Sequence, residues 1–97
     1  MDIKKVNIGE ALSKVTEHWD PHILGDLNDQ QVKIAKLKGE FVWHHHENED
    51  ELFLVIKGHL KIALEDKSIS LQPGEFVIIP KGVKHKPIMF TTDLALK

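Results

Sequence analysis

Residues 41–58 read FVWHHHENEDELFLVIKG, and this stretch decides the fold. Three consecutive histidines stand next to a group of acidic residues, and the apolar run LFLVI follows directly. The run is short, rich in residues that favour strands, and bounded by the polar segment ENED and by KG, which are turn signals. We therefore interpret the stretch as two strands joined by a polar turn.

The same alternation of apolar runs and turn signals continues from residue 31 to the end of the sequence. The runs lie in the segments QVKIAKLKGE, HLKIALED, SISLQPG, EFVIIP and IMFTTDLALK. Short strands at regular spacing, with no helical period between them, are typical of all-β barrels and sandwiches. The sequence therefore predicts an all-β fold, a small antiparallel β-barrel or sandwich.

Residues 1–30 carry weaker signals. Residues 8–18 predict little helix, at most one or two turns, and the segment WDPHILGDLND contains proline and glycine, which favour short extended pieces. We expect a single domain over residues 1–97, in which residues 1–30 pack on or beside the barrel and residues 31–97 form it. The closing DLALK still alternates where the sequence stops, so the last strand is expected to be cut short.

Composition narrows the class of protein. Of 97 residues, 13 are basic and 15 are acidic, interspersed to a net charge of −2, so no basic stripe is available for nucleic acid. The apolar runs are far shorter than the roughly 20 residues that a membrane span needs, and the amino terminus lacks a signal-peptide pattern. We expect a cytoplasmic protein that binds neither nucleic acid nor membrane. Without cysteine, any metal ion must be held by nitrogen and oxygen ligands.

The runs LFLVI and FVII are apolar at every position rather than at alternate positions. Strands of this kind are buried on both faces, one toward the barrel interior and one against a second surface. The amino-terminal segment or a second subunit would provide that surface. We expect a homodimer, because a barrel this small has apolar surface left to bury.

Several histidines and a carboxylate are spaced so that they could share a metal ion. Side chains alternate between the two faces of a strand, so His44 and His46 face the same side, about 7 Å apart. Glu51 begins the return strand close to these two histidines. Further along, Gly82 in the segment PKG permits a tight turn, and His85 follows three residues later. Nitrogen and oxygen donors of this kind suit a divalent metal ion.

This spacing resembles the two motifs of the cupin superfamily, G-x5-H-x-H-x3-4-E-x6-G and G-x5-P-x-G-x2-H-x3-N. The first motif is reproduced by His44-His45-His46, Glu51 and Gly58, and the second by Gly74, Pro80, Gly82 and His85. The sequence departs from the pattern at two positions. Gly39 stands one residue closer to the histidines than is usual, and Met89 replaces the final asparagine.

The resemblance implies a jelly-roll barrel that holds one divalent metal ion, Fe, Mn, Ni, Cu or Zn, near its centre. By position, the ligands would be His44, His46, Glu51 and His85. Such a set leaves one or two coordination positions open for water or substrate. The family includes dioxygenases, sugar-phosphate isomerases, decarboxylases and small binding domains, and no catalytic residue or substrate is singled out by the sequence.

Two classes of function therefore stay open, and a third possibility is a purely structural metal ion with no open coordination position. The first is an enzyme of the dioxygenase or isomerase type that acts on an unidentified small molecule. The second is a non-catalytic small-molecule binding or sensing module that uses the same metal ion.

The remaining four histidines are expected to lie outside the metal site. His45 faces the opposite side of its strand and is expected to be structural or exposed. No motif surrounds His18, His22 or His59. Of these, His59 follows Gly58 at a hairpin turn and is expected to be exposed.

Overall fold

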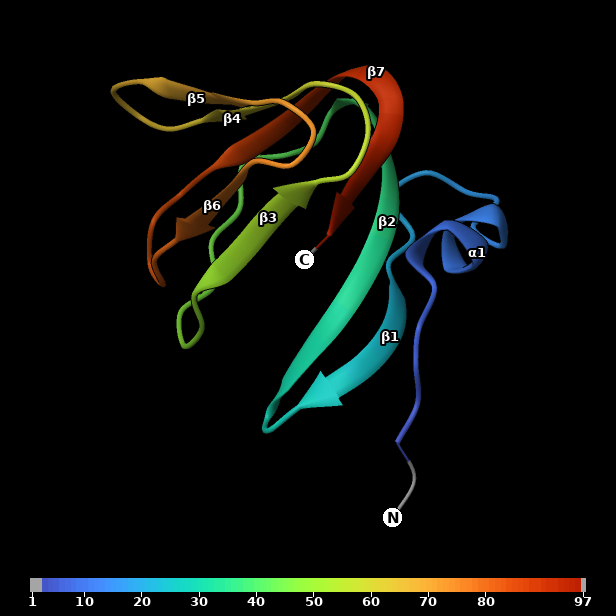
Figure 1. Ribbon diagram of the computed structural model, residues 1–97. Coiled ribbons are helices and arrows are strands. Elements are labelled where there is room, and N and C mark those ends of the chain that lie inside the picture. The colour runs from blue at the N-terminus through green and yellow to red at the C-terminus, as the bar shows by residue number, and fades with distance from the viewer. Residues whose placement is uncertain (1–2, 97) are drawn as a thin grey trace.

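The computed structural model describes the backbone of residues 3–96 and the side chains up to Met89. It contains one short helix and seven strands (Figure 1). These elements are α1 (Ile8–Ser13), β1 (His22–Leu27), β2 (Gln30–Glu40), β3 (Glu51–Val55), β4 (Leu60–Ala63), β5 (Ser68–Leu71), β6 (Phe76–Ile79) and β7 (Lys86–Leu96). The predicted all-β fold with little helix near the amino terminus is confirmed.

All strand pairs are antiparallel, and β7 joins the strands into one sheet system. The pairing order is β1-β2-β7-β3-β6, and a branch adds β4 to β7 and β5 to β4. This is the jelly-roll layout that the sequence predicts. Over residues 3–96, however, the pairing does not close into a ring, because β1 and β6 end the path without pairing with each other. Figure 1 shows β1 and the start of β2 as a hairpin that projects from the other strands.

The core lies between the inner faces of the strands. Phe53 and Val55 of β3 and Leu37 of β2 are fully buried, together with Leu60 and Ile62 of β4. Burial of each such side chain stabilises the fold by about 1.5–3 kcal/mol. Phe53 also touches the candidate site, because its ring lies edge-on to a histidine ring, that of His85, with 5.7 Å between centroids. One end of the core therefore supports the site.

The amino-terminal region packs on β2 through a few anchors. Asn7 caps α1 by accepting a hydrogen bond from the amide of Glu10 (2.9 Å). Val15 is buried against Ile34. Trp19 adopts a left-handed backbone conformation (φ 62°), and its amide donates to the carbonyl of Lys36 (2.7 Å). Within the described residues, no helix is long and apolar enough to cross a membrane.

Three details differ from the sequence predictions. Residues 41–46, expected as a regular strand, contain only an isolated bridge at His44. Residues 22–27, expected as short extended pieces, form the full strand β1. The outward side chains Phe76 and Ile78 of β6 are 60% and 52% exposed, so the second face of this strand is not buried within the single chain. The amino-terminal segment does not cover it.

Candidate metal centre

Two loops that are distant in sequence meet at the candidate site through reciprocal backbone hydrogen bonds. The amide of His44 donates to the carbonyl of His85 (3.0 Å), and the amide of His85 donates to the carbonyl of His44 (2.9 Å). This bridge brings the two imidazole centroids to 4.2 Å from each other. The histidine-rich loop and the residue preceding β7 are therefore fixed relative to one another.

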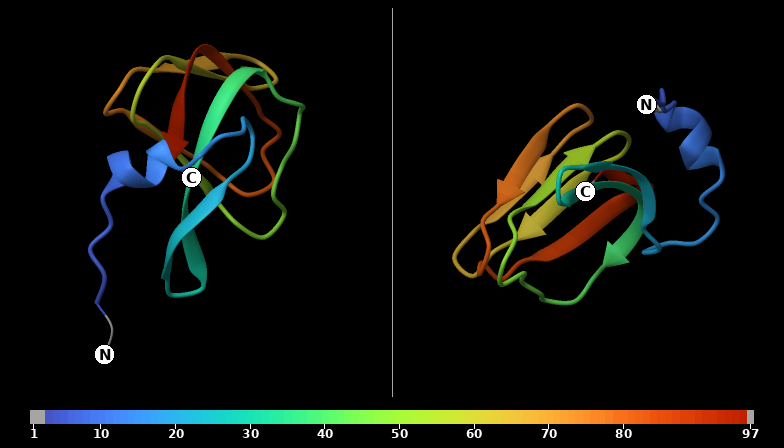
Figure 2. Two further views of the ribbon diagram at one scale, coloured as in Figure 1. Left: turned by 90° about the vertical axis from the view of Figure 1, so that its right-hand side faces the viewer. Right: turned by 90° about the horizontal axis from the view of Figure 1, so that it is seen from below.

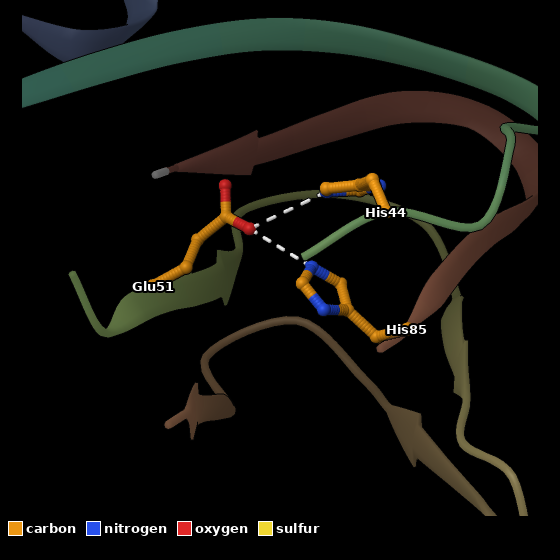
Figure 3. Close-up of side chains that lie close together, drawn as sticks. All are labelled: His44, Glu51 and His85. Atoms are coloured by element: carbon orange, nitrogen blue, oxygen red, sulfur yellow. Dashed lines mark hydrogen bonds and ion pairs between the residues drawn. The ribbon is translucent and has the colours of Figure 1, made fainter. Parts of the chain in front are cut away.

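The two imidazoles converge on Glu51, the first residue of β3 (Figure 3). Oε1 of Glu51 lies 3.0 Å from Nε2 of His85 and 3.6 Å from Nε2 of His44. One donor atom from each of these three residues lies within 4.8 Å of the other two. The His85 side chain is 1% exposed and that of Glu51 is 13% exposed, so both groups are withdrawn from bulk water.

Hydrogen bonds on the far side of the two rings determine which nitrogen faces the carboxylate. Nδ1 of His85 lies 2.9 Å from the carbonyl oxygen of Val83, and Nδ1 of His44 lies 3.2 Å from that of Val42. A carbonyl oxygen can only accept, so both Nδ1 atoms donate, and each neutral ring carries its lone pair on Nε2. These lone pairs face a carboxylate oxygen of Glu51, which is also an acceptor. Such a contact is favourable only with a cation between the groups, either a proton or a metal ion.

The donor set of the site therefore fits a divalent metal ion. Imidazole Nε2 atoms and a carboxylate oxygen are common ligands of zinc and of first-row transition metals. A backbone carbonyl that accepts the Nδ1 hydrogen is the usual partner that orients a metal-binding histidine. Both features are present at His44 and His85. The same donors suit Fe, Mn, Ni, Cu and Zn and do not separate them.

His46, the other predicted ligand, lies at the rim of this group. Its Nε2 is 3.4 Å from Oε1 of Glu51, but its ring centroid is 6.4 Å from that of His85, and its side chain is 47% exposed. It does not belong to the tight group of three. Residues 41–46 are not the regular strand that the predicted shared face assumed, yet Nε2 of His44 and Nε2 of His46 both approach Oε1 of Glu51, at 3.6 Å and 3.4 Å. His45 is exposed, as predicted, and lies 3.7 Å from Glu47.

The turn that carries His85 is held by a residue that the sequence did not single out. Oδ1 of Asp50 accepts a hydrogen bond from the amide of Lys81 (2.9 Å), and the amide of Gly82 donates to the carbonyl of His46 (2.7 Å). Gly82 has φ 82°, a conformation that other residues adopt only with strain. Asp50 stands in a run of polar residues, and no spacing rule distinguished it from its solvated neighbours.

Aromatic rings cover the other side of the site. The ring of Phe41 lies edge-on to His44, with 5.4 Å between centroids, and stacks on Trp19 at 4.7 Å with an interplanar angle of 17°. The indole of Trp19 donates to the carbonyl of Lys38 (3.0 Å). The amino-terminal region thus contacts the site through two successive ring contacts, a role that the sequence did not predict.

A cavity of about 680 Å³ lies beside Glu51 and His46. Its remaining walls come from the β1–β2 hairpin, the polar turn before β3, and the outward residues of β3 and β6: Asp26, Leu27, Asn28, Asp29, Gln30, Gln31, Val32, Lys33, Glu49, Asp50, Leu52 and Ile78. This volume is within the usual range for small-molecule sites. A small molecule could therefore reach the carboxylate and the rim histidine from this side.

The other three histidines lie away from the group. His18 forms an isolated bridge with Lys36, and Nε2 of His22 lies 3.2 Å from Oδ2 of Asp20. The predicted exposure of His59 is wrong, because this residue is partly buried and its Nδ1 lies 3.2 Å from the side-chain amide of Gln72.

Comparisons with known proteins agree with this fold. Residues 30–96 match the model of a family described as a cupin domain. The chain is 36% identical to the uncharacterized protein YdbB of Bacillus subtilis over 84 residues, which is 86% of this chain and 74% of that protein. The crystal structure of a cupin-2 domain containing protein from Shewanella frigidimarina is similar with a TM-score of 0.91 and 43% identity, covering 94% of this chain and 89% of that one.

A further similarity is partial. The chain is 31% identical to an acireductone dioxygenase of Bacillus licheniformis over 64 residues, which is 61% of this chain. The match covers 36% of that dioxygenase, so the chain spans little more than a third of its length.

Proposed function

The chain belongs to the cupin domain family, and from this premise we propose that it is a metal-dependent enzyme of the dioxygenase type that acts on a small molecule. The observation that carries the proposal is the convergence of imidazole Nε2 atoms on one carboxylate oxygen of Glu51, at 3.0 Å from His85 and 3.6 Å from His44. In the proposed centre His44, Glu51 and His85 bind the ion, and His46 joins them from the rim.

A bound ion would supply Lewis acidity and, if it is redox-active, would activate dioxygen, while the organic substrate would be oxidised and would supply the electrons that reduce dioxygen. The protein supplies position and environment. The carbonyls of Val83 and Val42 hold the two rings with Nε2 toward Glu51. Phe53 and Phe41 lie edge-on to the rings of His85 and His44, and the fully buried Phe53 excludes water from its side of His85. The cavity beside Glu51 gives a small molecule access from the opposite side.

The charges around the cavity favour a dioxygenase over a sugar-phosphate isomerase. A phosphorylated substrate needs basic residues at the mouth of its site. Here the lining includes one lysine, Lys33, among the carboxylates of Asp26, Asp29, Glu49 and Asp50 as well as Glu51. The partial similarity to acireductone dioxygenase supports the same choice.

Three accompanying proposals concern the whole chain. The 97 residues act as one domain, because the candidate site draws on residues from 44 to 85 and the amino-terminal region contacts it through Trp19. The protein is cytoplasmic. It forms a homodimer, because the outward side chains Phe76 and Ile78 and the hairpin residue Leu27 are more than half exposed in the single chain.

The test combines metal content with turnover. Protein purified without added metal is analysed for its elements, then loaded separately with Fe(II), Mn(II), Ni(II), Cu(II) and Zn(II), and oxygen uptake is measured with an enediol, a β-diketone and a catechol. We expect about one metal ion per chain and oxygen uptake with at least one redox-active ion, both lost in His85→Ala and kept in His45→Ala. Binding of these compounds without oxygen uptake would identify the non-catalytic sensing module instead. Absence of a stoichiometric metal ion in all preparations would refute the proposal.

A further inference from the structure

Lys33 stands on the face of β2 that points toward the core. Side chains alternate along a strand, so Lys33 shares its face with Ala35 and Leu37. Those two residues are 1% and 0% exposed and belong to the core. The intervening Ile34 packs against Val15 on the opposite face, which lies on the side of α1 (Figures 1 and 2). Lys33 therefore continues the core-facing row of β2 with a charged group.

The strand pairing places Lys33 across the sheet from the candidate site. Strands β2 and β3 flank β7, where Ala35 and Val55 both pair with Ala95. Both strands are antiparallel to β7 and so run in the same direction, which puts Lys33 level with Phe53, two residues earlier in each strand. The ring of Phe53 lies edge-on to a histidine of the candidate site. Two strand spacings, about 10 Å, separate β2 from β3, so a small molecule could bridge them.

The environment of Lys33 suits an anionic ligand. Lys33 and Glu51 both line the cavity beside the candidate site. Lys33 is half-buried, and it forms no ion pair with any side chain in the described part of the chain. Withdrawing a charge from water costs free energy unless an opposite charge compensates it. The other carboxylates of the lining are exposed, and solvent screens their charges: Asp26, Asp29, Glu49 and Asp50.

We propose that Lys33 binds a carboxylate group of the substrate, while another part of the substrate reaches the metal centre. This inference rests on the proposed function and names its substrate class, a small organic acid whose acid group is separate from the oxygen atoms that bind the ion. The single charge of the lysine ammonium matches that of a carboxylate. A phosphate group carries about two negative charges, and one lysine would leave it partly uncompensated among the carboxylates of the lining. Lys33 thus determines specificity, and the ion remains the place of reaction.

Catechols that bind a metal ion and differ in charge test the inference. Zn(II)-loaded protein is titrated by calorimetry with protocatechuate, homoprotocatechuate and dihydrocaffeate, whose carboxylates stand at increasing distance from the ring, and with the methyl ester of each. At least one acid should bind at least about 10-fold tighter than its ester, because a charge-assisted hydrogen bond adds this much affinity. If no acid binds tighter than its ester, the inference is wrong although Zn(II) still binds. Failure to bind Zn(II) would overturn the proposed centre as well.

Substitution of the lysine separates a binding role from a structural one. Lys33→Met keeps an unbranched side chain and removes the charge, so the preference for the acid should disappear while affinity for Zn(II) and for the ester stays unchanged. Lys36→Met is the matched control, since Lys36 is also half-buried on β2 but faces the opposite side and is not part of the cavity wall. A preference for the acid that persists in Lys33→Met would overturn the inference.

Charge reversal at the same position gives an independent outcome. Lys33→Glu should bind dopamine, a catechol with an ammonium side chain, at least about 10-fold tighter than wild type does, because the new carboxylate would complement the ligand charge. Thermal unfolding of the variant shows that it is folded under the conditions of the titration. Equal affinity of folded Lys33→Glu and wild type for dopamine would show that residue 33 does not contact the ligand.

Discussion

The candidate site has an inner wall, formed by His44 and His85, and a rim, formed by His46. The two parts are held in place differently. On the inner wall, His44 and His85 are tied by two backbone hydrogen bonds to each other and by one side-chain bond each to a carbonyl. On the rim, His46 is 47% exposed and lies 3.4 Å from Glu51. The wall is thus arranged before any ligand arrives, whereas the rim histidine has room to move. The difference teaches that the two histidines of the inner wall are preorganised, whereas the rim histidine is adjustable.

The largest effect on metal affinity is expected from a substitution on the inner wall. His85→Ala should weaken metal binding by more than about 100-fold, because loss of a hydrogen-bonded partner behind a ligand already costs 10–100-fold and here the ligand itself is lost. Titration of metal-free protein with Co(II), followed by calorimetry, measures the loss. His45→Ala is the control, since this neighbour is exposed and outside the group. Equal affinity of His85→Ala and wild type would break the assignment of the inner wall.

Acid should produce the next largest effect. A coordinating imidazole must be neutral, so protons compete with the metal ion, and metal affinity should fall as the pH is lowered. With two histidine ligands the fall approaches about 100-fold per pH unit, and a third ligand steepens it. The slope of metal affinity against pH therefore distinguishes the rim from the inner wall. His46→Ala should make this slope shallower only if His46 binds the ion. A flat response between pH 5 and 8 would contradict histidine ligation.

At the rim itself, His46→Ala should weaken metal binding by about 10-fold. The proposed ligands His44, Glu51 and His85 remain, and a water molecule can take the vacated position. The same Co(II) titration applies, and the absorption spectrum of the bound ion reports the change of ligand. If His46→Ala loses as much metal affinity as His85→Ala, the wall and the rim contribute equally and the proposed difference between them is wrong.

The smallest effect on metal affinity is expected at Asp50, which holds the two loops of the site together. Asp50→Ala removes the acceptor of the Lys81 amide hydrogen bond. Metal affinity should fall by less than about 10-fold, which is the low end of the effect of residues that position metal ligands without binding the ion. Asp50→Asn keeps an acceptor at this position and should restore most of the loss. Glu49→Ala is the matched control in the same turn. Metal affinity and thermal unfolding measured together separate positioning of His85 from general destabilisation.

Much of the fold could be predicted from short-range patterns. The apolar runs and turn signals located six of the seven strands, and motif spacing brought together Glu51 and His85, which are 34 residues apart. Strand β1 was not predicted as a regular strand, because Pro21 and Gly25 were interpreted as turn signals. In the structure the proline precedes the strand and the glycine lies at its bulge.

The finer arrangement of the site depends on contacts that no local pattern contains. Strand alternation predicted that His44 and His46 face the same side, and both approach Glu51, but it did not predict that His46 is the more exposed of the two, because residues 41–46 contain a single bridge. The bond from the Lys81 amide to Asp50 and the stack of Trp19 on Phe41 join segments whose approach is set by the tertiary fold. Such contacts follow from the assembled strands and could not be read from spacing.

The stack of Trp19 on Phe41 has a practical consequence. Of the two tryptophans in the chain, Trp19 is separated from His44 by one aromatic ring, whereas Trp43 is half exposed with Lys86 over its face. A paramagnetic ion held by His44 would quench the emission of an indole so close to it. The protein therefore contains its own optical reporter, and Trp43→Phe would leave a single fluorophore whose brightness follows occupancy of the centre.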